Sequence, residues 1–107
     1  MPLLLSLLIS LLVACRGPYW EQTLPPAPVT GITELADTTA RCRAKFHTLG
    51  CYNRQTGVIW IQAGLEPQLR LCVLNHERKH AQGYDHPHFN EPGYGIDCGD
   101  GTVMPGA

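Results

Sequence analysis

The sequence predicts a small α+β domain, and three observations support this fold class. Val58-Ile59-Trp60-Ile61 is a β-branched and aromatic run that is typical of a strand. After Pro67, apolar residues recur at helical spacing. The chain has 107 residues, of which 44% are hydrophobic, so it forms one folded domain with a modest core. A core of this size often needs disulfides or a metal for stability.

The first expected element is a helix over residues 32–46 that would back the sheet. Ile32, Leu35 and Ala36 follow the i, i+3, i+4 spacing of a helix, and Thr33 would cap its start. The next element is a hairpin, in which residues 51–54 pair with the strand over residues 58–61.

A second helix is expected to begin at Pro67, which suits a first helical turn, with Glu66 near the positive end of the helix dipole. Gly83 would end this helix. Residues 84–107 are rich in Gly and Pro and should be mostly loop.

Residues 3–14 form an apolar run that is too short to span a bilayer but suits the apolar region of a secretory signal. Its end, Leu12-Val13-Ala14-Cys15, resembles the lipobox of bacterial lipoproteins. The resemblance implies that residues 1–14 are a lipoprotein signal peptide and that Cys15 carries a lipid anchor. Because Arg16 rather than Asp follows the cysteine, the same resemblance implies the periplasmic face of the outer membrane. An ordinary signal peptide with a chance cysteine is the alternative.

Residues 15–31 contain four prolines and no apolar periodicity, so we expect a semi-extended, Pro-rich tether. Tyr19 and Trp20 within it could rest at a membrane surface or pack on the domain. The folded domain would then span residues 32–107.

Four cysteines follow Cys15, namely Cys42, Cys51, Cys72 and Cys98. An even number in a small exported domain predicts two disulfides, for which three pairings exist. We favour Cys42 with Cys51, which are close in sequence, and Cys72 with Cys98. Buried free thiols are the alternative.

The segment HERKHAQGYDH, residues 76–86, has the spacing of a metal site. His76 and His80 are four residues apart, so on a helix they differ by about 40° in direction and about 6 Å in height and can bind one ion. Gly83 can adopt the left-handed conformation that turns the chain back, which would add His86 as a third ligand. Three protein ligands leave a fourth position open, as in catalytic zinc sites. Glu77 would lie near the metal and could accept a proton from water.

Other interpretations of this segment remain open. His88 and Asp85 are rivals to His86 as the third ligand. The whole segment could also be a polar helix face with solvated histidines.

The pattern H-E-x-x-H-x-x-G-x-x-H resembles that of the metzincin clan of zinc metallopeptidases. The resemblance implies a minimal zincin-like domain that binds Zn²⁺ through His76, His80 and His86 and uses Glu77 as the catalytic base. It also implies a Met-containing turn beneath the metal, which Met104 in residues 102–105 would provide unless it is a core residue. Tyr94 could hydrogen-bond an oxyanion or simply pack.

We therefore expect a zinc metallopeptidase that acts on peptide or protein substrates in the cell envelope. The alternative is a non-catalytic zinc-binding envelope lipoprotein, and a third hypothesis is an interaction module with a decayed active site. The net charge of −1 and the scattered basic residues argue against nucleic acid as a partner. The sequence does not predict an oligomeric state.

Overall fold

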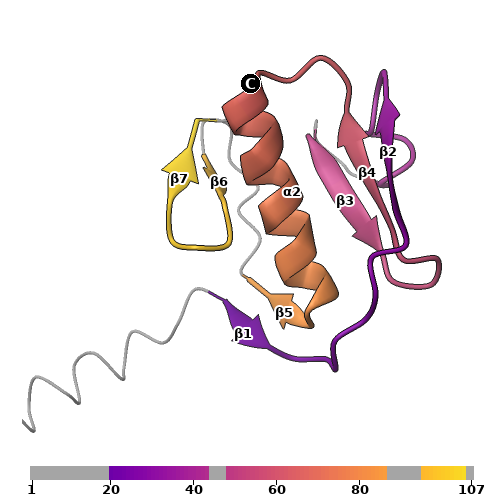
Figure 1. The fold of residues 1–107 in the computed structure, drawn as a ribbon, viewed down its shortest axis with the longest axis vertical. Coiled ribbons are helices and arrows are strands. Elements are labelled where there is room, and N and C mark those ends of the chain that lie inside the picture. Colours follow the sequence, from indigo (N-terminus) through magenta and orange to yellow (C-terminus); the bar gives the residue numbers. More distant parts are fainter. Residues whose placement is uncertain (1–19, 44–47, 87–94, 106–107) are drawn as a thin grey trace, which may run out of the picture.

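A three-stranded sheet packs along one side of the helix α2, and two short strand pairs border the same helix (Figure 1). The structure is a computed structural model that describes residues 20–43, 48–86 and 95–105. Its elements are β1 (Glu21–Gln22), β2 (Gly31–Leu35), β3 (Gly50–Asn53), β4 (Val58–Gln62), α2 (Pro67–Ala81), β5 (Tyr84–Asp85), β6 (Ile96–Asp97) and β7 (Val103–Met104). The sheet orders are β2-β4-β3, β1-β5 and β6-β7. The predicted α+β class is confirmed.

The predicted hairpin is formed by β3 and β4, which pair in antiparallel register. Asn53 organises the turn, because its side-chain oxygen accepts hydrogen bonds from the backbone N–H groups of Gln55 and Thr56. Its backbone carbonyl accepts a further bond from the N–H of Gly57. Asparagine favours such turns because its side chain mimics a backbone acceptor.

The helix predicted over residues 32–46 is wrong in the part that the structure describes. Residues 31–35 form β2, which pairs in parallel with β4, and Thr33 lies inside this strand rather than at a helix cap. β4 offers an open edge of backbone donors and acceptors, and pairing with β2 satisfies them. Ile32 and Thr33 are β-branched and suit a strand. Residues 44–47 of the expected helix lie outside the described residues.

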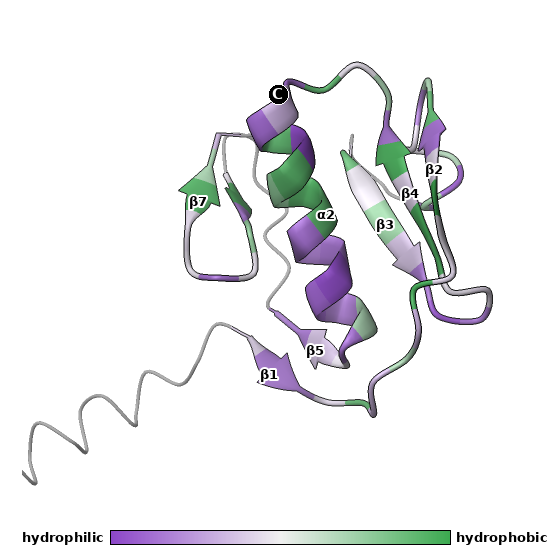
Figure 2. Ribbon diagram, viewed as in Figure 1, coloured by the Kyte–Doolittle hydropathy of each residue, from purple (hydrophilic) through white to green (hydrophobic). Residues whose placement is uncertain are grey.

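The hydrophobic core lies between the sheet and the N-terminal half of α2. Ile59 and Ile61 are two residues apart on β4, so their side chains lie on the same face of the sheet and point toward the helix. Both are fully buried, as is Val73 of α2. Leu69 and Leu74 complete the helix's contribution. In Figure 2 the middle of α2 is hydrophobic, whereas its C-terminal turns beside β5 are hydrophilic. One half of the helix therefore packs in the core, and the other half carries the polar side chains.

The ends of α2 agree with the sequence prediction. The Glu66 carboxylate accepts hydrogen bonds from the backbone N–H groups of Gln68 and Leu69, both at 3.1 Å. This satisfies donors that have no partner within the helix. At the other end, Gly83 has a φ of +96° and its N–H donates to the His80 carbonyl. The chain leaves the helix in the left-handed conformation that glycine adopts without strain.

Residues 20–30, which we call the N-terminal strap, are extended but are not a free tether. β1 pairs antiparallel with β5, and the N–H groups of Thr23 and Leu24 donate to the Gly83 carbonyl. Further on, the Ala27 N–H donates to the Ala81 carbonyl and the Tyr52 hydroxyl to the Pro28 carbonyl. In Figure 1 the strap passes beneath the C-terminal end of α2 before it enters β2. The prediction of a tether over residues 15–31 is therefore wrong for residues 20–31.

Both predicted disulfides are present, joining Cys42 to Cys51 and Cys72 to Cys98. The second bond ties α2 to the segment that contains β6. The predicted signal peptide, residues 1–14, and the predicted lipidation site Cys15 lie outside the described residues. Within the described ranges, no helix is both long and apolar enough to cross a membrane.

We expect the pair of substitutions Cys72→Ala and Cys98→Ala to lower the free energy of unfolding by about 3 kcal/mol, because the lost bond closes a loop of 26 residues. Removing the Cys42–Cys51 bond, whose cysteines are 9 residues apart, should cost about 1 kcal/mol less. Urea unfolding of the purified variants measures both values. An unchanged unfolding midpoint after loss of Cys72–Cys98 would contradict the expectation.

Candidate metal centre

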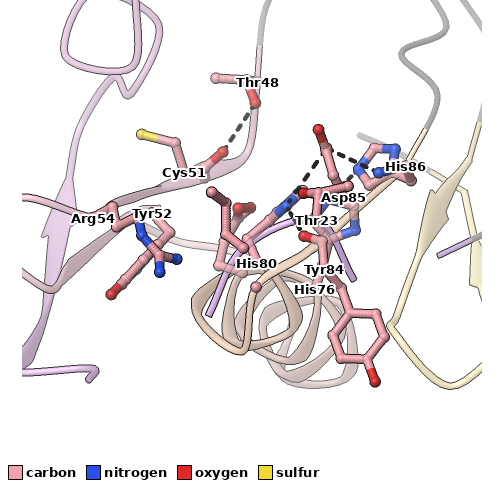
Figure 3. Close-up of a pocket in the computed structure, with 14 residues that line it drawn as sticks. Thr23, Thr48, Cys51, Tyr52, Arg54, His76, His80, Tyr84, Asp85 and His86 are labelled. Atoms are coloured by element: carbon pink, nitrogen blue, oxygen red, sulfur yellow. Dashed lines mark hydrogen bonds and ion pairs between the residues drawn. The ribbon is translucent and has the colours of Figure 1, made fainter. Parts of the chain in front are cut away.

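Three histidine rings converge at the C-terminal end of α2. His76 and His80 are one helical turn apart, and His86 directly follows β5. The Nε2 atom of His76 lies 3.3 Å from that of His80 and 3.1 Å from that of His86. All the ligand atoms of this cluster lie within 4.8 Å of one another, so the three residues could hold a metal ion. Figure 3 shows them at one side of a cavity, opposite Tyr52 and Arg54.

The chain reversal after Gly83 brings His86 into this cluster, as predicted. β5 turns back beside the helix and pairs with β1, and the Asp85 carboxylate accepts a hydrogen bond from the His86 N–H at 2.9 Å. Asp85 itself lies on the outer side of the His80 ring, with its Oδ1 4.0 Å from Nδ1. It therefore does not join the converging Nε2 atoms. The rival ligand His88 lies outside the described residues.

Hydrogen bonds to backbone carbonyls orient the rings of His76 and His80. Nδ1 of His76 lies 2.6 Å from the Asp97 carbonyl oxygen, and Nδ1 of His80 lies 3.0 Å from that of Tyr84. A carbonyl only accepts, so each Nδ1 carries the proton and donates it. The lone pair of each ring then resides on Nε2, which faces the centre of the cluster. Metal-binding histidines in proteins are oriented by outer contacts of this kind.

Burial keeps His76 in the neutral form that a metal requires. Loss of solvation lowers the pKa of His76 to about 4, although the hydrogen bond to the Asp97 carbonyl partly opposes this shift. His80 and His86 lower the pKa further, because a second positive charge nearby is unfavourable. At neutral pH the Nε2 atom of His76 is therefore free of a proton.

Glu77 is buried beside the histidines, with 5% of its surface exposed. It lines the same cavity of about 490 Å³ as His76, His80 and His86. Burial raises the pKa of Glu77 to about 8, so the metal-free protein holds a proton there at neutral pH. Gly50 of β3 allows the sheet to approach this position, since a Cβ there would lie 2.9 Å from Val73 and 3.7 Å from Glu77. The arrangement places a proton-exchanging group next to the cluster.

The region expected to form a Met-containing turn has a different local structure. Met104 lies in β7, opposite Ile96 of β6, and packs against the hydrophobic core. The alternative interpretation of Met104 as a core residue therefore describes its position. Tyr94, the candidate oxyanion donor, lies outside the described residues.

Sequence reasoning missed the role of Asp97 and left the place of Trp20 open. Asp97 supplies the carbonyl that binds His76, and Trp20 packs against all three histidine rings. A signal for Asp97 existed, because Cys72 and His76 lie one turn apart on α2. The predicted Cys72–Cys98 bond therefore places the neighbour of Cys98 close to His76.

The chain matches no protein-family model, and no curated protein or solved structure is significantly similar to it.

We expect the purified protein to bind about one zinc ion per chain, as a single three-histidine site would. His80→Ala removes one of the three nitrogens and should weaken binding by more than roughly 100-fold, the upper end of the effect of outer contacts alone. Arg78→Ala is a matched control, because it changes an exposed residue on the same helical turn. Elemental analysis and chelator competition measure both quantities. Equal zinc content in wild type and His80→Ala would contradict this site.

Proposed function

We propose that this protein is a zinc-dependent, metallopeptidase-like lipoprotein that hydrolyses peptide bonds in the bacterial cell envelope. The observation that carries the proposal is the convergence of three imidazole Nε2 atoms beside the buried carboxyl group of Glu77 in an open cavity. The H-E-x-x-H-x-x-G-x-x-H pattern, which resembles that of metzincin peptidases, supports the same assignment.

The donor set suits zinc. Zn–N bonds of about 2.0–2.1 Å in a tetrahedron imply about 3.3–3.4 Å between neighbouring nitrogens. The distances from His76 Nε2 to the other two Nε2 atoms, 3.3 and 3.1 Å, are close to this value. The four cysteines of the described residues are bound in disulfides, so they offer no thiolate for a closed structural site. Three nitrogen ligands with one open position are the arrangement of catalytic zinc.

In this proposal Glu77 is the catalytic residue. A bound zinc ion would polarise a substrate carbonyl and make water more acidic. Glu77 would take a proton from the attacking water and deliver it to the leaving amine as the C–N bond breaks. Burial raises the pKa of Glu77 to about 8 in the metal-free protein, and the positive charge of a bound ion would lower it again, which would give Glu77 the carboxylate form that a base requires. His76 and His80 would keep their orientation through their carbonyl partners.

The docked strap bears on where such an enzyme would act. Trp20 already contacts the histidines, and it lies five positions after the proposed lipidation site Cys15 in the sequence. Five extended residues span at most about 18 Å. A lipid on Cys15 would therefore hold the site close to the membrane surface, at the periplasmic face of the outer membrane. Substrates would be peptides or proteins that lie near that surface.

A non-catalytic zinc-binding lipoprotein is the second candidate, and the origin of the ligands favours it. Two of the histidines lie near the end of α2, and the third follows β5, the strand that pairs with the strap. A metal would therefore cross-link these parts and stabilise a small fold. This function would not need Glu77.

We expect Glu77→Gln to retain zinc but to lose hydrolysis of a fluorogenic casein by at least roughly 100-fold, the lower end of general acid–base contributions. Glu34→Gln is the matched control, since it removes an exposed carboxylate from β2 by the same chemical change. Full activity in Glu77→Gln would refute the mechanism. A zinc-loaded wild type without hydrolysis would favour the second candidate.

A further inference from the structure

We propose that Trp20 is a positioning residue of the metal centre, and that it sets the metal affinity by holding the three ligand rings and Asp97 in place. The inference rests on the proposed metal site and adds to it a residue far from the motif in sequence. The N-terminal strap is then part of the site rather than a connection to it.

Trp20 touches each ligand. Its ring centroid lies 5.0 Å from that of His76, 5.1 Å from that of His80 and 4.6 Å from that of His86. The interplanar angles of 67°, 68° and 77° are those of edge-to-face contacts. Such contacts between aromatic rings are favourable. One indole therefore restricts the rotation of all three imidazoles at once.

Trp20 also reaches the residue that orients His76. Its Nε1–H donates to the Asp97 Oδ1 at 2.9 Å, and the backbone carbonyl of Asp97 accepts from Nδ1 of His76 at 2.6 Å. The Gly99 N–H donates to the same Oδ1 at 2.7 Å. Asp97 is buried, with 9% of its surface exposed, so these donors are what stabilises its carboxylate. Loss of the indole N–H would loosen Asp97 and, through it, His76.

Backbone pairing holds Trp20 at this position. β1 begins at the next residue, and its register pairs Glu21 with Asp85 and Gln22 with Tyr84. The same register places Trp20 opposite His86. Trp20 is not among the residues that line the cavity beside Glu77, so it supports the rings from outside the cavity. A substrate could therefore enter the cavity while the indole stays in place.

The test measures zinc affinity by chelator competition in Trp20→Phe and Trp20→Ala. Phenylalanine keeps a ring but loses the N–H, so we expect a loss of a few-fold; alanine loses both, and we expect about tenfold or more, as for other outer contacts of metal ligands. Trp60→Phe is the matched control. Trp60 alternates with the buried Ile59 and Ile61 on β4, so its side chain lies on the sheet face away from α2. The zinc affinity of Trp60→Phe should equal that of wild type.

A fluorescence measurement gives a readout that does not require Trp20→Ala to fold. The chain has two tryptophans, so Trp60→Phe leaves Trp20 as the only one. Zinc should change the emission of Trp60→Phe and leave that of Trp20→Phe unchanged.

The outcomes separate this inference from the proposed function. If wild type binds zinc and Trp20→Ala, still folded by circular dichroism, binds it equally well, the positioning role is refuted while the metal site stands. If Trp20→Ala does not fold, the positioning role of Trp20 is refuted when zinc leaves the fluorescence emission of Trp60→Phe unchanged. If wild type binds no zinc, the metal site and this inference both fail.

Discussion

Gly83 ends α2 with a φ of +96°, and three parts of the molecule meet at this residue. Its carbonyl accepts the N–H groups of Thr23 and Leu24 at 2.9 and 3.1 Å, which docks the N-terminal strap. A Cβ at this position would lie 1.9 Å from the Leu24 carbonyl oxygen, so only glycine leaves room for that segment. The chain that follows turns back and delivers His86 to within 3.1 Å of His76. The helix end, the docked strap and the third histidine of the cluster all depend on this one reversal.

The division of α2 into two halves explains how a small domain supports a polar site. Leu69, Val73 and Leu74 bury their side chains against the sheet, and this burial supplies the main stabilisation. His76 and His80 lie further along the same helix, so the packing of its first half also fixes their backbone positions. The Cys72–Cys98 disulfide adds a covalent link beside Asp97, whose carbonyl orients His76. The core, the disulfide and the histidine cluster are therefore physically connected.

Burial acts on the two kinds of ionisable group in opposite directions. It lowers the pKa of His76 to about 4 and raises that of Glu77 to about 8, and both shifts favour the neutral form. The metal-free site thus avoids isolated buried charge, which is costly. The imidazole nitrogens remain available as lone-pair donors at neutral pH. A cation bound by them would be compensated by the nearby Asp97 carboxylate, which two N–H donors hold in place.

The sequence by itself determined the features that depend on local spacing. Glu66 and Gly83 mark the ends of α2, the β-branched run after Gly57 indicates the hairpin, and His76, His80 and Gly83 already imply that His86 can join one cluster. The two disulfides were also predicted, because few cysteines limit the pairings.

Only the tertiary structure decided the features that depend on distant partners. Residues 31–35 form a strand because they pair with the open edge of β4. The spacing of apolar residues in this segment gives no sign of that pairing. Met104 lies in a strand because it pairs with Ile96 of β6. The strap docks because β1 pairs with β5, the strand that follows α2. Trp20 meets Asp97 across 77 residues of sequence. Contacts at such separations leave no periodic trace in the chain, since they arise from the packing of whole elements rather than from neighbouring residues.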